Sequence, residues 1–77
     1  MAREILQIKI KSIHPNVRIV CSQEVIEELC RSIRSVGQLE PIEVWYGGGI
    51  FRIVDGEKRW RACKKLKMTH IKAVLSE

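Results

Sequence analysis

The stretch that decides the fold is residues 53–62, which read Ile53-Val54-Asp55-Gly56-Glu57-Lys58-Arg59-Trp60-Arg61-Ala62. Its apolar start is typical of the end of a strand, and Asp55-Gly56 then predicts a turn. A helix is expected to follow over about residues 57–67. Lys58 and Arg59 fall in the first turn of this helix, where the helix dipole disfavours positive charge. Because a bound anion would reverse that penalty, their placement indicates a binding function.

The start of this helix offers a site for a phosphate. The first amides of a helix have no partner inside the helix and therefore form an anion site. A glycine at position 56 would let a phosphate approach these amides closely. Helical spacing directs Arg59 across the strand ends and places Lys58, Arg61 and Lys65 on a more solvated face. The alternative is that these cations form only a solvated basic surface.

The clearest helix elsewhere in the chain lies between Ser22 and Gly37. Ser22 is a good N-cap residue, and the glutamates that follow it suit the positive end of a helix. Gly37 supplies a C-terminal stop. We interpret Cys30 in this helix as a small core residue. The apolar residues recur at helical spacing and predict one buried face, made of Val25, Ile26, Leu29, Cys30, Ile33 and Val36.

The remaining apolar segments predict strands. They cover residues 6–10, 42–46, 50–54 and 71–75, with a turn at Pro15-Asn16 and a hairpin turn at Gly47-Gly48-Gly49. The resulting order β-α-β-β-α-β predicts a small α+β fold with its helices packed on a mixed sheet. At 77 residues, the chain is expected to form a single domain over residues 1–77.

Composition narrows the functional classes. The chain carries 14 basic and 9 acidic residues, a net charge of +5, which favours anionic partners such as nucleotides or nucleic acid. No apolar run approaches the ~18 residues of a membrane span, so no membrane association and a cytoplasmic location are expected. The residues that could bind a metal lack ligand spacing, which predicts no metal site in the protein alone: Cys21, Cys30, Cys63, His14 and His70.

Residues 55–62 resemble the G-E-R-R-x-R-A box of the ParB N-terminal domain family. A second match lies upstream, where residues 26–33 and 37–42 look like that family's I-E-E-L-A-x-S-I…G-x-x-Q-P-I box. Residues 15–18, Pro-Asn-Val-Arg, are loosely similar to its P-N-P…R turn. The boxes occur in order over nearly the whole chain, and the resemblance implies a ParB/sulfiredoxin-like fold.

The resemblance also implies a ligand. ParB-type domains bind a nucleoside triphosphate, which is CTP in the chromosome-partition members, usually together with Mg²⁺. By this resemblance, the phosphates would be held by Gly56, Glu57, Lys58 and Arg59. Lys58 replaces the arginine usual in the family, which keeps the charge but loses the planar fork that binds two oxygens at once. The resemblance therefore implies a nucleotide-binding module linked to DNA partition or transcriptional regulation.

The second box implies where the rest of the nucleotide lies. Gly37, Glu40 and Pro41 would border the base and the ribose. Glu40 replaces the usual glutamine, so the identity of the base stays open. The family's third nucleotide box, its helix-turn-helix DNA reader and its dimerisation domain lie downstream of the part that this chain matches. Sequence-specific DNA binding is therefore not expected, whereas weak non-specific nucleic-acid binding and a protein partner or homodimer remain open.

The alternative function is an enzyme on the same scaffold, either a phosphoryl transferase such as a small-molecule kinase or a ParB-like nuclease. Asp55 and Glu57 are the acids in the box, so one of them would be the general base or a metal ligand. A free-serine kinase branch carries D-G-H-H-R here, of which this chain keeps Asp55, Gly56 and Arg59. Sulfiredoxin chemistry is not expected, because Glu57 occupies the position of that family's catalytic cysteine.

Overall fold

A five-stranded mixed sheet and two α-helices make up the part of the chain that the computed structural model describes, residues 3–15, 21–38 and 40–76. This confirms the α+β fold expected from the sequence. The elements are, in order, β1 (Leu6–Lys9), the 3₁₀ turn η1 (Ile10–Ser12), β2 (Ile13–His14), α1 (Gln23–Val36), β3 (Ile42–Gly47), β4 (Ile50–Asp55), α2 (Glu57–Lys65) and β5 (His70–Leu75).

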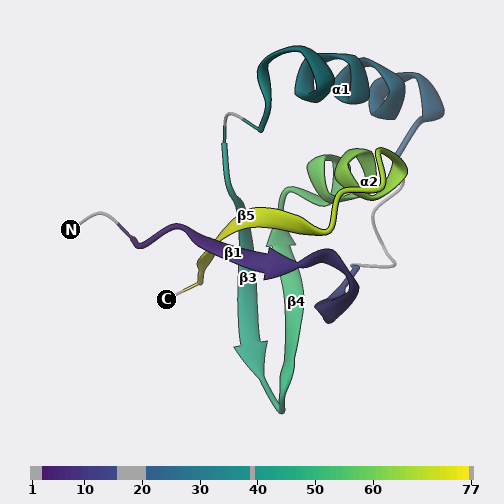
Figure 1. Ribbon diagram of the computed structural model, residues 1–77. Coiled ribbons are helices and arrows are strands. Elements are labelled where there is room, and N and C mark those ends of the chain that lie inside the picture. Colours follow the sequence, from purple (N-terminus) through teal and green to yellow (C-terminus); the bar gives the residue numbers. More distant parts are fainter. Residues whose placement is uncertain (1–2, 16–20, 39, 77) are drawn as a thin grey trace.

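The sheet has the strand order β1-β5-β3-β4-β2. The pairs β1–β5 and β3–β4 are antiparallel, whereas β3–β5 and β2–β4 are parallel. In Figure 1 the β3–β4 hairpin extends away from the helices. Gly48 and Gly49 close this hairpin with φ values of +61° and +80°. Two successive positive φ angles match the tight turn that suits the twist of a hairpin.

The first strand differs from the expectation for residues 6–10. Period-two burial stops after Ile10, and Ile10 and Ile13 are both buried at a spacing of three residues. The chain therefore leaves β1 through η1, and the amide of Ile10 donates to the carbonyl of Thr69 at 3.0 Å. Two further residues then form β2 against β4, a short strand that alternation alone did not predict. Of the expected turn, Pro15 lies outside the strands and Asn16 lies outside the described residues.

Helix α1 begins and ends as the sequence predicts. The Ser22 side chain accepts a hydrogen bond from the amide of Val25 at 3.2 Å. At the other end Gly37 has φ +80°, and its amide donates to the carbonyl of Ile33 at 2.8 Å. The predicted apolar face is narrower than expected, because Val25 and Val36 are exposed. Its buried part consists of Ile26, Cys30 and Ile33, with Leu29 half-buried beside them.

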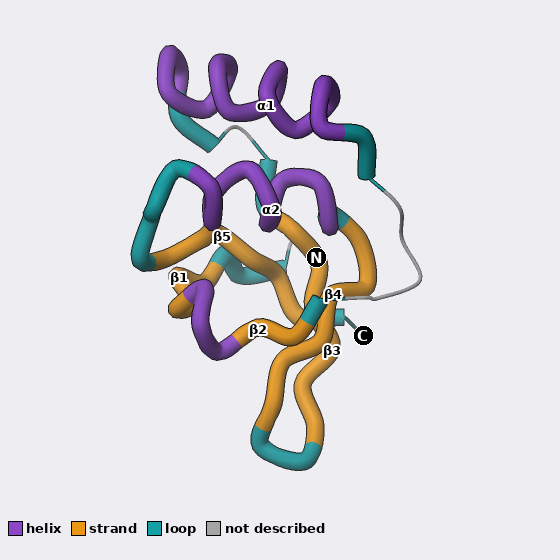
Figure 2. Tube along the Cα trace, turned by 90° about the vertical axis from the view of Figure 1, so that its right-hand side faces the viewer, coloured by secondary structure: helices purple, strands orange, loops and turns teal. Residues whose placement is uncertain are grey.

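The helices form two layers on the same side of the sheet. Figures 1 and 2 show α2 lying between α1 and the sheet. Ala62 and Cys63 of α2 are fully buried, and the Cys30 thiol of α1 donates to the carbonyl of Ala62 at 3.6 Å. Helix α2 ends at Lys65, two residues before the expected end, and Lys67 has φ +60°. Neither helix has the length and apolar character that crossing a bilayer requires.

Candidate functional site

An open cleft of about 500 Å³ lies between α1 and the start of α2. Its volume falls within the range of about 300–1,000 Å³ that is usual for small-molecule sites. Helix α1 contributes Val25, Glu28 and Leu29 to the lining. The rest of the lining is the predicted stretch itself, Asp55, Gly56, Glu57, Lys58 and Arg59. The structure thus places five of the predicted site residues around one cavity.

Gly56 is the N-cap of α2 and has φ +103°. A side chain at this position would collide with β3, because an added Cβ would lie 2.6 Å from Cγ2 of Ile42. The glycine is therefore needed to pack the turn against the sheet. The sequence had indicated that this glycine forms the turn and lets a phosphate approach, but not that it packs against Ile42. Having no side chain, Gly56 also leaves the first amides of α2 without a side-chain acceptor from the N-cap residue.

The two acids of the stretch differ in their surroundings. Asp55 is exposed at the end of β4, beside the start of the helix. Glu57 is 2% exposed, and its carboxylate accepts from Nε of Arg61 at 2.9 Å. A buried acid in the first turn is stabilised by the positive end of the helix. This geometry gives Glu57 a role in holding the helix start together, and it leaves Asp55 as an exposed carboxylate of the cleft, together with Glu28 from α1.

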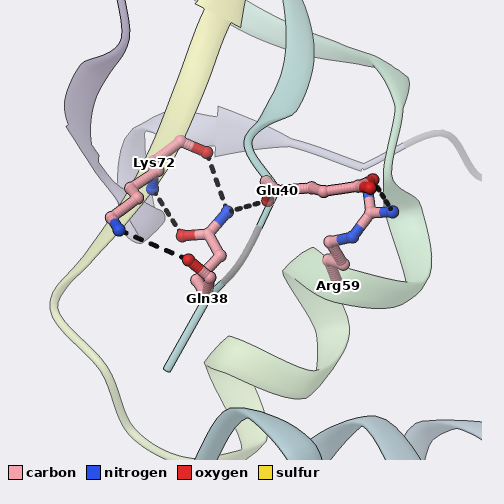
Figure 3. Close-up of polar contacts among 4 residues, drawn as sticks. All are labelled: Gln38, Glu40, Arg59 and Lys72. Carbon is pink, nitrogen blue, oxygen red and sulfur yellow. Dashed lines mark hydrogen bonds and ion pairs between the residues drawn. The ribbon is translucent and has the colours of Figure 1, made fainter. Parts of the chain in front are cut away.

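The two cations of the stretch are also unlike each other. Lys58 is exposed at the cleft, whereas the Arg59 side chain is 32% exposed. Arg59 donates from Nη2 to Oε2 of Glu40 at 2.9 Å, as Figure 3 shows. Glu40 is thereby joined to the cleft through Arg59. Gly37 and Pro41, which the resemblance placed beside the base and ribose, are outside the lining of this cleft.

A hydrogen-bonded side chain that the sequence did not single out lies behind Glu40. Gln38 is 7% exposed. Its side-chain Oε1 accepts from the Lys72 backbone N–H at 2.8 Å, and its Nε2 donates to the Lys72 backbone carbonyl at 3.0 Å. It also donates to the carbonyl of Glu40 at 2.9 Å, as Figure 3 shows. Because Lys72 precedes the residues of β5 that pair with β3, the Gln38 amide takes the place of strand backbone beside β5. A single glutamine between a helix stop and a proline carries no signal for this role.

Other cations of α2 have partners outside the cleft. Lys65 pairs with Glu27 at 3.7 Å, and Nζ of Lys64 lies 5.0 Å from the centre of the Trp60 ring. Trp60 is buried and is part of the core. Lys64 and Lys65 therefore fit the alternative of a solvated basic surface. Neither of them lines the cleft, so this alternative does not apply to Lys58 and Arg59 there.

The cysteines are not arranged for chemistry in the cleft. Cys63 is fully buried, and burial together with the neighbouring Cys30 raises the pKa of its thiol. A thiol in such surroundings is a poor nucleophile, because the thiolate is the reactive form. Within residues 3–15, 21–38 and 40–76, no three His, Cys, Asp or Glu side chains gather as a metal site.

A larger cavity, about 890 Å³, lies between the β1–β2 region and the end of α2. Its lining includes Ile10, Ile13, Trp60, Lys64 and Thr69. None of the residues predicted for the binding site lines it. The cleft at the start of α2 is therefore the candidate site, because the predicted residues converge there.

The sequence model described as "ParB N-terminal domain" matches residues 1–77. Among curated proteins, the chain is 43% identical over 76 residues to a nucleoid occlusion protein of Geobacillus kaustophilus. That match covers 94% of this chain and 27% of the relative. The chain thus spans about a quarter of the length of the curated relatives it matches.

Two solved structures show the same fold. The C-terminally truncated chromosome-partitioning protein ParB of Caulobacter crescentus, complexed with CTP-gamma-S, matches with a TM-score of 0.85 and 30% identity. The match covers 96% of this chain and 44% of that one. Sulfiredoxin of Arabidopsis thaliana matches with a TM-score of 0.87 and 25% identity over 96% of this chain and 85% of that one.

Proposed function

The chain belongs to the ParB N-terminal domain family, and on this premise we propose that it binds a nucleoside triphosphate in the cleft at the start of α2. The observation that carries the proposal is the convergence of Gly56, Lys58 and Arg59 on one cavity at a helix N-terminus. The Caulobacter relative of similar fold was solved with CTP-gamma-S, which supports CTP as the first ligand to test.

The phosphates are proposed to lie on the first turn of α2. The amides of Lys58 and Arg59 are in that turn, and both side chains line the cleft. Two cations at the positive end of a helix are unfavourable by themselves, and a polyphosphate would neutralise them. Hydrogen bonds to charged groups contribute about 1.5–3 kcal/mol each, so Arg59 alone would account for a measurable part of the affinity.

The base and ribose are proposed to extend toward the connection between α1 and β3. The contact between Arg59 and Glu40 joins the phosphate end of the cleft to that connection. Gly37, Glu40 and Pro41 are the residues that would border this part of the ligand. Titration with the four ribonucleoside triphosphates identifies the preferred base.

A Mg²⁺ ion is proposed to enter with the triphosphate. Mg²⁺ is usually bound by one or two carboxylates together with substrate phosphates and water. Glu28 and Asp55 are exposed carboxylates in the lining of the cleft, so the donor set fits an ion of this kind. The ion would neutralise phosphate charge beside these two acids.

The wider role is proposed from the relatives' names alone. Those names refer to nucleoid occlusion and chromosome partitioning, so we place the chain in DNA partition or transcriptional regulation in the cytoplasm. Non-specific nucleic-acid binding and a protein partner or second copy belong to the same proposal.

The exposed carboxylate of Asp55 favours a second candidate function, phosphoryl transfer or nuclease activity on the same scaffold. Asp55 lines the cleft and has the accessibility that a general base needs, whereas Glu57 is buried against Arg61. The two functions separate in one assay. An enzyme would release phosphate or cleave nucleic acid and lose that activity in Asp55→Asn, whereas a binding module would bind the nucleotide without turnover.

Calorimetric titration of wild type, Arg59→Ala and Lys58→Ala with CTP and Mg²⁺ tests the binding function. We expect Arg59→Ala to weaken binding by about one to two orders of magnitude, and Lys58→Ala by less because its side chain is exposed. Arg52→Ala is the matched control, since it removes the same charge from β4 outside the cleft. Equal affinity in wild type and Arg59→Ala would contradict the proposed site.

A further inference from the structure

The Arg59 guanidinium already has an anionic partner. Its Nη2 lies 2.9 Å from Oε2 of Glu40. The Arg59 side chain is 32% exposed and the Glu40 side chain 72% exposed, so the carboxylate reaches the guanidinium from the solvent side. A phosphate oxygen would use the same N–H donors, because carboxylate and phosphate offer guanidinium similar geometry.

The backbone of Glu40 is held inside the fold, whereas its carboxylate is exposed and is held by the ion pair with Arg59. The Glu40 carbonyl accepts from the Gln38 amide at 2.9 Å, and Gln38 is fixed by two hydrogen bonds to the backbone of Lys72 (Figure 3). The base of the Glu40 side chain is therefore anchored to β5. Because the Glu40 side chain is 72% exposed, its carboxylate can leave Arg59 without movement of the anchored backbone.

We propose that Glu40 is a built-in competitor of the ligand, and that its carboxylate lowers the affinity of the site for polyphosphates by occupying Arg59. The inference rests on the proposed nucleotide binding. An exposed ion pair costs little to break, whereas a polyphosphate brings several charges to the guanidinium, so the ligand displaces Glu40. The displaced carboxylate stays near the phosphates and repels them. A neutral glutamine at this position, as in the family's box, would compete for Arg59 only through a weaker neutral hydrogen bond and would not repel the phosphates.

The test is calorimetric titration of wild type and Glu40→Gln with CTP and with inorganic tripolyphosphate, each with Mg²⁺. Tripolyphosphate has no base, so it isolates the phosphate contact. We expect Glu40→Gln to bind both ligands about three- to tenfold more tightly. Glu27→Gln is the matched control, because it removes the same charge from an exposed ion pair outside the cleft and should change affinity less than twofold.

A double-mutant cycle separates competition at Arg59 from a general effect of charge. If Glu40 acts by occupying Arg59, Glu40→Gln gains much less affinity in an Arg59→Ala background. Undiminished gain in that background overturns the inference, as does unchanged or weaker binding by Glu40→Gln when the wild type binds. Absence of triphosphate binding in wild type and Glu40→Gln alike overturns the proposed function and this inference with it.

Discussion

Gly56 meets two requirements that a larger residue cannot meet. Its φ of +103° lies in the left-handed region, and the space where a Cβ would go is filled by Ile42. The tight approach of the turn to β3 sets where α2 begins. The position of Lys58 and Arg59 at the cleft therefore depends on packing against the sheet.

Gly56→Ala is expected to lower the free energy of unfolding by about 2–4 kcal/mol, because it adds backbone strain and a steric clash. Urea unfolding followed by circular dichroism measures the loss. Gly49→Ala is the control, since Gly49 has φ +80° and nothing within 4 Å of an added Cβ. It should lose only about 1–2 kcal/mol from the backbone. Equal losses in the two variants would contradict the clash with Ile42.

The raised pKa of the Cys63 thiol leads us to expect that the protein loses stability at alkaline pH. This pKa is raised from the usual value of 9.0 by burial and by Cys30. The folded protein therefore keeps this proton to higher pH than the unfolded chain does, and the associated stability is complete below about pH 9 and falls as pH rises through the folded pKa. Urea midpoints between pH 7 and 10.5 should fall less steeply in Cys63→Ala than in wild type. Cys21→Ala should follow the wild-type slope, and a parallel decline in Cys63→Ala would refute the assignment.

Single residues show what the sequence predicts well and where it falls short. The glycine turn predicted that Arg59 lies in the first turn of α2, as the structure shows, because a helix start depends on local geometry. The burial of Glu57 against Arg61 was not predicted, since the sequence pattern of an acid at a helix start is the same whether that acid is exposed or buried. The contact of Arg59 with Glu40 joins residues 19 positions apart and depends on how the sheet brings them together.

Among the elements, the connection between α1 and β3 is held by a side chain in place of backbone pairing. Gln38 bonds both backbone groups of Lys72 at the edge of β5. Gln38→Leu keeps a similar volume but leaves those groups without the amide, so we expect a loss of about 2–4 kcal/mol in urea unfolding. Hydrogen exchange of the Lys72 amide should also become faster.

Gln7→Leu is the matched control for Gln38. Gln7 is exposed on β1, the strand that pairs with β5 on the edge opposite Gln38, and it lies directly across from Lys72. Its replacement should change stability by less than about 0.5 kcal/mol. A loss in Gln38→Leu no larger than in Gln7→Leu would show that the amide does not hold the connection.

The helices and strands themselves were largely predictable. Ser22 and Gly37 marked the ends of α1 because capping is a local property. The layering of α1 on α2 was not predictable from the sequence, since an apolar stripe shows which face of a helix is buried but not which element covers it. Val25 is exposed because it lines the open cleft, and Val36 is exposed in the last turn of α1. Strand β2 has two residues, too few for alternation to detect.

For the whole molecule, the sheet order β1-β5-β3-β4-β2 brings together the two sequence stretches that resemble the ParB boxes. The α1–β3 connection and the start of α2 belong to separate boxes, and the contact of Glu40 with Arg59 joins them. The family resemblance predicted that both boxes serve one ligand. Local physical arguments alone left the basic helix surface as an equal alternative, because charge placement does not show which side a cavity lies on.

The most direct test of nucleotide binding at α2 is a ¹H–¹⁵N titration of the full chain with CTP and Mg²⁺. We expect saturable shifts of the Gly56, Lys58 and Arg59 amides and of the Arg59 Nε–H, because these groups line the cleft. The amides of Ile10 and Thr69, which line the larger cavity, should shift little. Shifts centred on Ile10 and Thr69, or no saturable shift with any of the four triphosphates, would contradict the site at the start of α2.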